Sequence, residues 1–158
     1  MISLKSETTV QGVNGDQIIH FMLHCNDQRY HNWWPEAHFR FHTISAKEGY
    51  VGSLVYFDEM VGKRRLKFKA VIVSYLPGQS VKWQMKFGIL LPASVTLDCQ
   101  ETSAGLQITH ILRAGFNGAG RVLDPFIRLY LSRKFEAALN EHAQYEFQKL
   151  SELLQQSS

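Results

Sequence analysis

Apolar and polar residues alternate through most of the central part of the chain. The segment 81–87, VKWQMKF, shows this period of two clearly. Such alternation is typical of antiparallel strands that bury one face and expose the other. We expect about seven strands, over 4–10, 39–44, 51–61, 64–75, 81–87, 95–100 and 106–112.

Helical patterns lie on either side of these strands. A short helix over 16–25, with Asp16 as its N-cap, follows the first strand. A second short helix or an irregular segment covers 30–38. A long helical period over 125–154 then follows a glycine-rich segment, with the pair Asp124-Pro125 as N-cap and first-turn proline.

These elements predict an α+β fold in a single domain over 1–158. The length of 158 residues suits one domain, and no linker or repeat divides it. A strongly curved antiparallel sheet that wraps round the long C-terminal helix is the natural packing, with the two short helices placed after the first strand. One helix cannot fill the concave side of such a sheet, so we expect a cavity between them.

Composition narrows the function classes. The 17 basic and 14 acidic residues give a net charge of only +3, and the one basic run, 63–69, suits a solvated strand face, so we expect no nucleic-acid partner. No apolar run approaches the roughly 20 residues of a membrane-spanning helix, and the N-terminus has no secretory pattern. Two cysteines give no disulfide framework, which favours a cytoplasmic location. Motifs for nucleotide, thiol-redox and serine-hydrolase chemistry do not occur.

The order of elements resembles the START-like, Bet v 1-like helix-grip superfamily of polyketide cyclase and lipid-transport type. The segment Trp33-Trp34-Pro35 after the first helices, the glycine-rich approach to the last helix and the length of that helix carry the resemblance. It implies a deep apolar cavity for a hydrophobic ligand. The same fold hosts carriers, sensors and enzymes, so it does not decide between them.

Several apolar side chains are candidates for lining that cavity. Each one alone fits ordinary core packing, but as a set they suit a planar aromatic or polyketide-like molecule. We expect a shared cavity of about 300 Å³ or more. The ligand-binding candidates are Trp34, Trp83, Met85, Phe87, Phe135 and Leu139.

The last helix carries two polar residues within its apolar stripe. His142 and Glu146 are four residues apart and therefore project to one side, one turn from each other. A carboxylate buried there needs a proton, a cation or a metal ion. The pair could also simply form hydrogen bonds or reach water.

Two further candidates come from the start of the sheet. His38 lies where the chain enters the sheet, and Glu59 shares a strand face with apolar neighbours. Asp58 would replace Glu59 if the opposite face points inward, and His42 is an additional candidate.

Together, His38, Glu59, His142 and Glu146 are similar to the zinc site of the diacetylphloroglucinol hydrolase family, metal-dependent carbon–carbon hydrolases of this fold. The resemblance implies one divalent metal ion, most naturally zinc. His110, which alternates with apolar residues on its strand, is the candidate catalytic acid or base, although a core histidine would show the same pattern.

The sequence thus supports two functions. The first is a carrier that binds a small hydrophobic or aromatic molecule without chemistry. The second is a metal-dependent hydrolase or cyclase that acts on a ketone-bearing aromatic or polyketide substrate. Only the enzyme requires the four candidate ligands to converge on one point, and in that case His142→Ala should abolish metal binding while sparing the fold.

Overall fold

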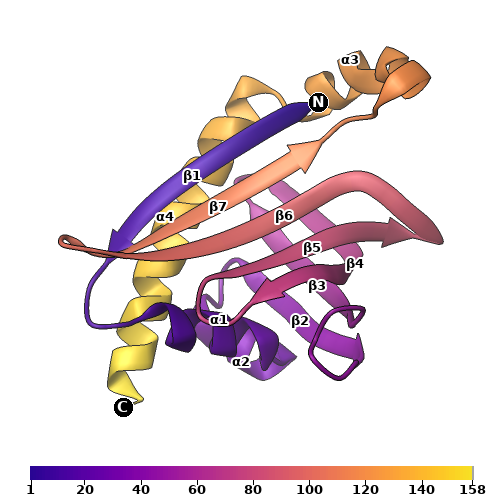
Figure 1. The fold of residues 1–158 in the computed structure, drawn as a ribbon. Helices are drawn as coiled ribbons and strands as arrows, with labels where there is room; N and C mark the ends of the chain where they lie inside the picture. Colours follow the sequence, from indigo (N-terminus) through magenta and orange to yellow (C-terminus); the bar gives the residue numbers. More distant parts are fainter. Residues whose placement is uncertain (158) are drawn as a thin grey trace.

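The computed structural model describes residues 1–157 and contains one seven-stranded antiparallel sheet (Figure 1). The strand order is β1-β7-β6-β5-β4-β3-β2, so the meander from β2 to β7 is closed by β1 at the far edge. The predicted strand number and the antiparallel pairing are confirmed. The strands are β1 (Ile2–Val10), β2 (His38–Ser45), β3 (Leu54–Val61), β4 (Arg64–Leu76), β5 (Ser80–Phe87), β6 (Ile89–Thr102) and β7 (Gly105–Ala114).

The helices lie where the sequence places them along the chain, with α4 packed across the sheet. The helix-grip arrangement of the α+β fold is therefore confirmed. No helix within residues 1–157 is both long and apolar enough to cross a membrane. The helical elements are α1 (Gly15–Leu23), α2 (Asp27–Trp33), the 3₁₀ segment η1 (Gly118–Leu123), α3 (Asp124–Tyr130) and α4 (Arg133–Gln156).

The predicted long helix over 125–154 is wrong at its beginning. Leu131 leaves helical geometry at φ −88° and ψ 58°, which ends α3. Ser132 then caps a new helix, because its side chain accepts a hydrogen bond from the Phe135 N–H at 3.4 Å. The proline does lie in the first turn of α3, but Asp124 is not its side-chain cap. Instead Asp124 accepts hydrogen bonds from the N-terminal amine and from the Phe116 N–H.

The N-cap of the first helix also differs from the prediction. Asn14, not Asp16, accepts a hydrogen bond from the Gln17 N–H, and the Gln17 side chain accepts one from the Asn14 N–H. This reciprocal capping box fixes the entry of α1 two residues earlier than the sequence pattern predicts.

The concave side of the sheet holds the main core. Aromatic side chains from several elements fill it, and Phe57 from β3 stacks on Phe41 and meets Trp83 edge to face. Cys25 and Cys99 are both buried and free.

At the β3–β4 turn, α4 approaches the sheet closely. Gly62 has φ +59°, and a Cβ atom on it would lie 2.9 Å from the Ala138 Cβ. Only glycine suits both the left-handed turn and this close approach. The contact holds the first half of α4 against the end of β3, where the polar side chains described below come together.

Candidate metal centre

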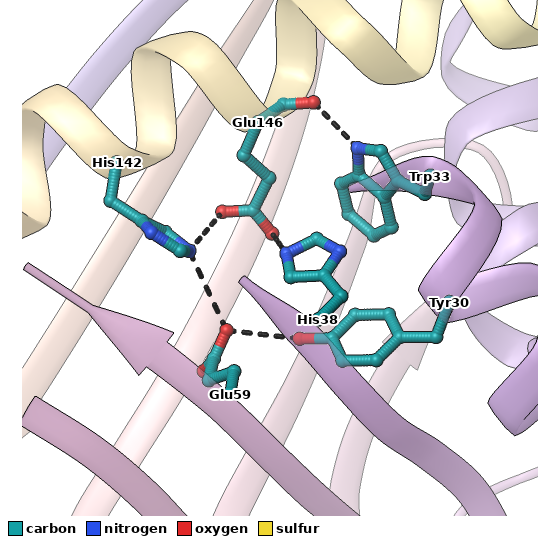
Figure 2. Close-up of polar contacts among 6 residues, drawn as sticks. All are labelled: Tyr30, Trp33, His38, Glu59, His142 and Glu146. Carbon is teal, nitrogen blue, oxygen red and sulfur yellow. Dashed lines mark hydrogen bonds and ion pairs between the residues drawn. The ribbon is translucent and has the colours of Figure 1, made fainter. Parts of the chain in front are cut away.

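Four polar side chains from three elements meet between the sheet and α4, and all are buried except Glu59, which is half-buried (Figure 2). His38 and Glu59 face each other directly in the pairing of β2 with β3. His142 and Glu146 lie one turn apart on α4. One nitrogen or oxygen atom from each residue lies within 4.8 Å of those of the other three. The predicted set of two histidines and two glutamates does form one cluster.

The distances within this cluster suit an ion better than direct hydrogen bonds. His142 Nε2 lies 3.4 Å from Glu146 Oε2 and 3.6 Å from Glu59 Oε2, while His38 Nε2 lies 3.7 Å from Glu146 Oε1. Hydrogen bonds between such groups are normally shorter than about 3.2 Å. Four atoms that each lie about 2.0–2.1 Å from a tetrahedral zinc ion are about 3.3–3.4 Å from one another.

Both histidines of the cluster have buried ring nitrogens without a hydrogen-bond partner among the described residues. His38 is fully buried, His142 is almost so, and the Nε2 atom of each has no hydrogen-bond partner within residues 1–157. Buried polar atoms nearly always find a partner, because leaving one unpaired costs about 1–3 kcal/mol. The cluster could therefore hold a metal ion, for which the two unpaired nitrogens and the two carboxylates are the donors.

Burial and charge set opposite protonation states on the two carboxyl groups. Burial raises the pKa of Glu146 to about 8, with a further rise from Glu59 and only partial relief from His142. Burial acts in the same direction on Glu59, but contact with His142, the charge of His38 and the Tyr30 hydrogen bond outweigh it and lower the pKa to about 2.

The two histidines are also unlike. Burial lowers the pKa of His38 to about 3, so this ring is neutral at pH 7. The pKa of His142 is raised above its usual value, because contact with Glu59 and the charge of Glu146 outweigh the effect of burial. At neutral pH the metal-free cluster thus has an ionised Glu59 beside His142, whose protonated form this contact favours. Glu146 and His38 are mainly neutral.

Two residues of α2 contact three members of the cluster and position them. The Tyr30 hydroxyl donates to Glu59 Oε2 at 2.9 Å, and its ring stacks on His38 with centroids 3.9 Å apart (Figure 2). The indole N–H of Trp33 donates to the backbone carbonyl of Glu146 at 2.7 Å. Sequence reasoning missed Tyr30 and Trp33 in this role. The sequence shows only that Tyr30 and Trp33 are three residues apart and therefore share one face of a short helix. This spacing does not reveal which residues they contact.

Removing the Tyr30 hydroxyl is expected to weaken metal binding without unfolding the protein. Tyr30→Phe keeps the ring stacked on His38 but removes the hydroxyl that donates to Glu59 Oε2 at 2.9 Å. Loss of such an outer contact typically costs about 10–100-fold in metal affinity. Competition with a chromophoric chelator measures this loss. Zinc affinity equal to that of the wild type would show that the hydroxyl does not orient Glu59.

The structure decides between the alternative acids of β3. Asp58 points away from the cluster, and the Arg65 guanidinium donates to both of its oxygens, at 2.8 and 3.0 Å. Glu59 is therefore the inward acid. His42 lies outside the cluster and faces Asp27 at a distance of 2.7 Å.

A small enclosed cavity adjoins the cluster. Its volume is about 70 Å³, and its wall includes Glu59, His142 and Glu146 together with His110. Burial lowers the pKa of His110 to about 4, and its Nδ1 atom has no partner among the described residues. His110 thus lies on the cavity side of β7, as predicted, as a neutral imidazole.

The enclosed cavity that the predicted residues line is smaller than the expected volume of about 300 Å³. Trp83, Met85, Phe135 and Leu139 line the 70 Å³ cavity as predicted, but their own bulk fills most of the concavity. An open groove of about 730 Å³ lies next to it, between α3 and the ends of β4 to β7. The groove and the cavity share five wall residues: Leu66, Phe68, Met85, Leu112 and Phe135.

Two predicted ligand-binding residues lie elsewhere. Phe87 is 84% exposed at the tip of the β5–β6 hairpin, because a register shift between Gln84 and Lys86 interrupts the alternation and the tip extends away from α4 (Figure 1). Trp34 does not line the cavity. Its ring packs on the outer side of His142, with centroids 4.6 Å apart, in a separate surface pocket.

Comparisons by sequence identify no relative: no family profile and no curated protein matches the chain. Solved structures do match. A protein of unknown function from Staphylococcus aureus has a TM-score of 0.61 at 9% identity, over 99% of this chain and 94% of its own. The major latex-like protein 151 from Panax ginseng has a TM-score of 0.54 at 15% identity, over 86% and 95% of the two chains. The Aha1 dimer from Colwellia psychrerythraea has a TM-score of 0.51 at 12% identity, over 90% and 96%. At these identities the likeness concerns the fold alone, and the chain has the helix-grip fold of START-like and Bet v 1-like proteins.

Proposed function

We propose that this protein is a metal-dependent hydrolase that acts on a hydrophobic, ketone-bearing molecule. The observation that carries the proposal is the convergence of His38, Glu59, His142 and Glu146 at the wall of an apolar cavity, with two buried imidazole nitrogens left unpaired. A carrier has no need for such a cluster, whose carboxylates cost free energy to bury.

Zinc fits this donor set best. Imidazole nitrogen and carboxylate oxygen are both common zinc ligands, and three or four such donors are typical of zinc sites. When bound, a zinc ion would polarise a ketone oxygen and lower the pKa of a nearby water molecule to about 7.

The remaining groups of the chain act on the substrate itself. The apolar wall formed by Trp83, Leu139 and Phe147 excludes bulk water and favours an aromatic ring. The neutral His110 can accept a proton inside the cavity, since its low pKa keeps the ring unprotonated and its Nδ1 atom is unpaired.

The proposed reaction is hydrolysis of the bond between a ketone carbon and an aromatic ring. Water adds its oxygen to the ketone carbon, and the bond from that carbon to the ring breaks. The electron pair of the broken bond stays on the ring carbon. In this proposal the neutral His110 accepts a proton from the attacking water and passes it to that ring carbon. The products are a carboxylic acid and the deacylated ring, so no oxidant or reductant is consumed.

Elemental analysis of protein purified without a histidine tag tests the metal, with about one zinc per chain expected. Incubation with an acetylated polyhydroxybenzene tests the chemistry. Acetate should be released by the zinc-loaded protein, should not be released after chelation, and should return when zinc is restored. Metal-free protein that binds the aromatic compound without releasing acetate would support the carrier function instead.

Zinc affinity is expected to rise with pH up to about 8 and then to level off. Glu146, with its pKa raised to about 8, must lose its proton before it can ligate, and His142, whose pKa is also raised, must be in its neutral form. Each displaced proton makes the affinity rise by up to about tenfold per pH unit below the pKa of its group. Chelator competition between pH 6 and pH 9 measures the slope, and an affinity that stays constant over that range would contradict these protonation states.

A further inference from the structure

Exposed apolar side chains gather at one end of the molecule. Of the thirteen large hydrophobic side chains that residues 1–157 expose, nine lie on the N-terminus, the β5–β6 turn, η1 and α3. Figure 1 shows these segments at the end of the molecule opposite the C-terminus of α4. We call this the groove end. The nine are Met1, Phe87, Ile89, Leu90, Val122, Leu123, Phe126, Leu129 and Tyr130.

The same end is strongly basic. Over 61–69, 85–93 and 112–136 the sequence has eleven basic residues and two acidic ones. The rest of the chain has six basic and twelve acidic residues, although the whole protein carries only +3. One of the two acids, Asp124, is already paired with the N-terminal amine at 2.9 Å. The basic residues are Lys63, Arg64, Arg65, Lys67, Lys69, Lys86, Arg113, Arg121, Arg128, Arg133 and Lys134.

The apolar groove opens between these features. Its wall combines Phe126 and Ile127 of α3 with Leu91 and Pro92 at the beginning of β6, and its volume is about 730 Å³. The groove and the inner cavity share wall residues, among them Phe135, so the groove end lies directly beside the apolar cavity.

We propose that the groove end docks on an anionic lipid surface. Lysine and arginine around an apolar patch favour that occupant, since the cations meet lipid head groups while exposed aromatic and aliphatic side chains enter the interface. A second copy of this chain would bring two strongly positive ends together, which the charge opposes. A nucleic acid would satisfy the cations but would leave aliphatic side chains such as Val122 and Leu129 in water.

Co-sedimentation with vesicles tests this proposal, which does not depend on the metal. The wild-type protein is expected to bind vesicles of phosphatidylcholine mixed with phosphatidylglycerol at least about tenfold more tightly than vesicles of phosphatidylcholine alone, and raised salt should weaken that binding. The double variant Phe126→Ser with Leu129→Ser removes two exposed side chains of α3 and should lose at least tenfold in affinity. Arg128→Glu with Lys134→Glu should lose a similar factor on the anionic vesicles only.

The matched control is Val51→Ser with Leu76→Ser, which removes two exposed apolar side chains that do not belong to the groove end. It should bind vesicles like the wild type, and circular dichroism should show all variants folded. The proposal is overturned by equal binding to both kinds of vesicle, by equal losses in control and groove-end variants, or by no binding at all. It is also overturned by a wild-type dimer that the α3 variant converts to monomers, or by tight binding to a polynucleotide that the serine substitutions leave intact.

Discussion

Replacing His142 with alanine is expected to lower zinc affinity by well over the roughly 10–100-fold that loss of an outer contact costs, because a ligand itself is removed. His142 Nε2 is the atom that lies nearest to both carboxylates of the cluster, at 3.4 and 3.6 Å. It therefore joins the glutamate of α4 to the glutamate of β3. Chelator competition gives the affinity, and elemental analysis of the purified variant should find almost no zinc.

A second variant keeps this test free of folding effects. In the metal-free protein His142 lies 3.6 Å from Glu59 Oε2, and alanine removes this partner from the carboxylate, which can cost up to about 3–5 kcal/mol if the pair is ionised. His142→Gln retains an N–H donor for Glu59 but not the imidazole ligand. It should stay folded and still lose zinc.

Two other histidines serve as controls. His20→Ala changes an exposed ring outside the cluster and should bind zinc normally. His110→Gln should also keep its zinc while losing hydrolysis, since His110 lines the cavity but is not one of the four clustered residues. Zinc affinity of His142→Gln within tenfold of the wild type would contradict the site.

Most of the fold and the four clustered residues could be predicted from local patterns. The i, i+4 spacing of His142 and Glu146 places both on one side of any helix, wherever that helix packs. The direct pairing of His38 with Glu59 could not be read in the same way. It depends on the register between β2 and β3, which contains bulges on both sides of the paired segment. For the same reason the sequence left Asp58 and Glu59 as alternatives, since a shift of one residue exchanges the two faces.

The incorrect predictions arise where a sequence pattern continues past the last residue that packs in the core. Phe87 continues the alternation in the sequence of β5, but in the structure a register shift after Gln84 and the departure of the hairpin from the core leave its ring exposed. The helical spacing of apolar residues also continues through 125–154 of the sequence. In the structure, however, Ser132 caps the beginning of a new helix. The cavity volume depends on how the rotamers of Trp83 and Phe135 fill the concave face, and composition does not contain that information.

Glu146→Gln is expected to stabilise the metal-free protein and at the same time to remove its response to zinc. The folded-state pKa of Glu146 is raised to about 8, against 4.5 for an ordinary glutamate side chain. Between these two pH values the folded protein binds a proton that the unfolded chain does not. The metal-free protein therefore loses stability as pH rises through this window, and the full penalty is present above pH 8.

Glutamine has nearly the same shape and carries no charge at any pH, so the variant avoids this penalty. At pH 8 its free energy of unfolding without metal should exceed that of the wild type by about 1–3 kcal/mol, or about 2–4 °C in Tm for each kcal/mol.

Zinc is expected to reverse this order of stability. At a free concentration of 1,000 times Kd it should add about 4.1 kcal/mol to the wild type. It should add almost nothing to Glu146→Gln, because a neutral amide is a poor zinc ligand.

Thermal unfolding at pH 5 and pH 8, with chelator and with zinc, measures both effects. The matched control is Glu141→Gln, on the exposed side of α4. A metal-free Glu146→Gln that melts below the wild type at pH 8 would mean that the Glu146 carboxyl stabilises the fold by itself. The cluster would then have a structural reason to exist without a metal.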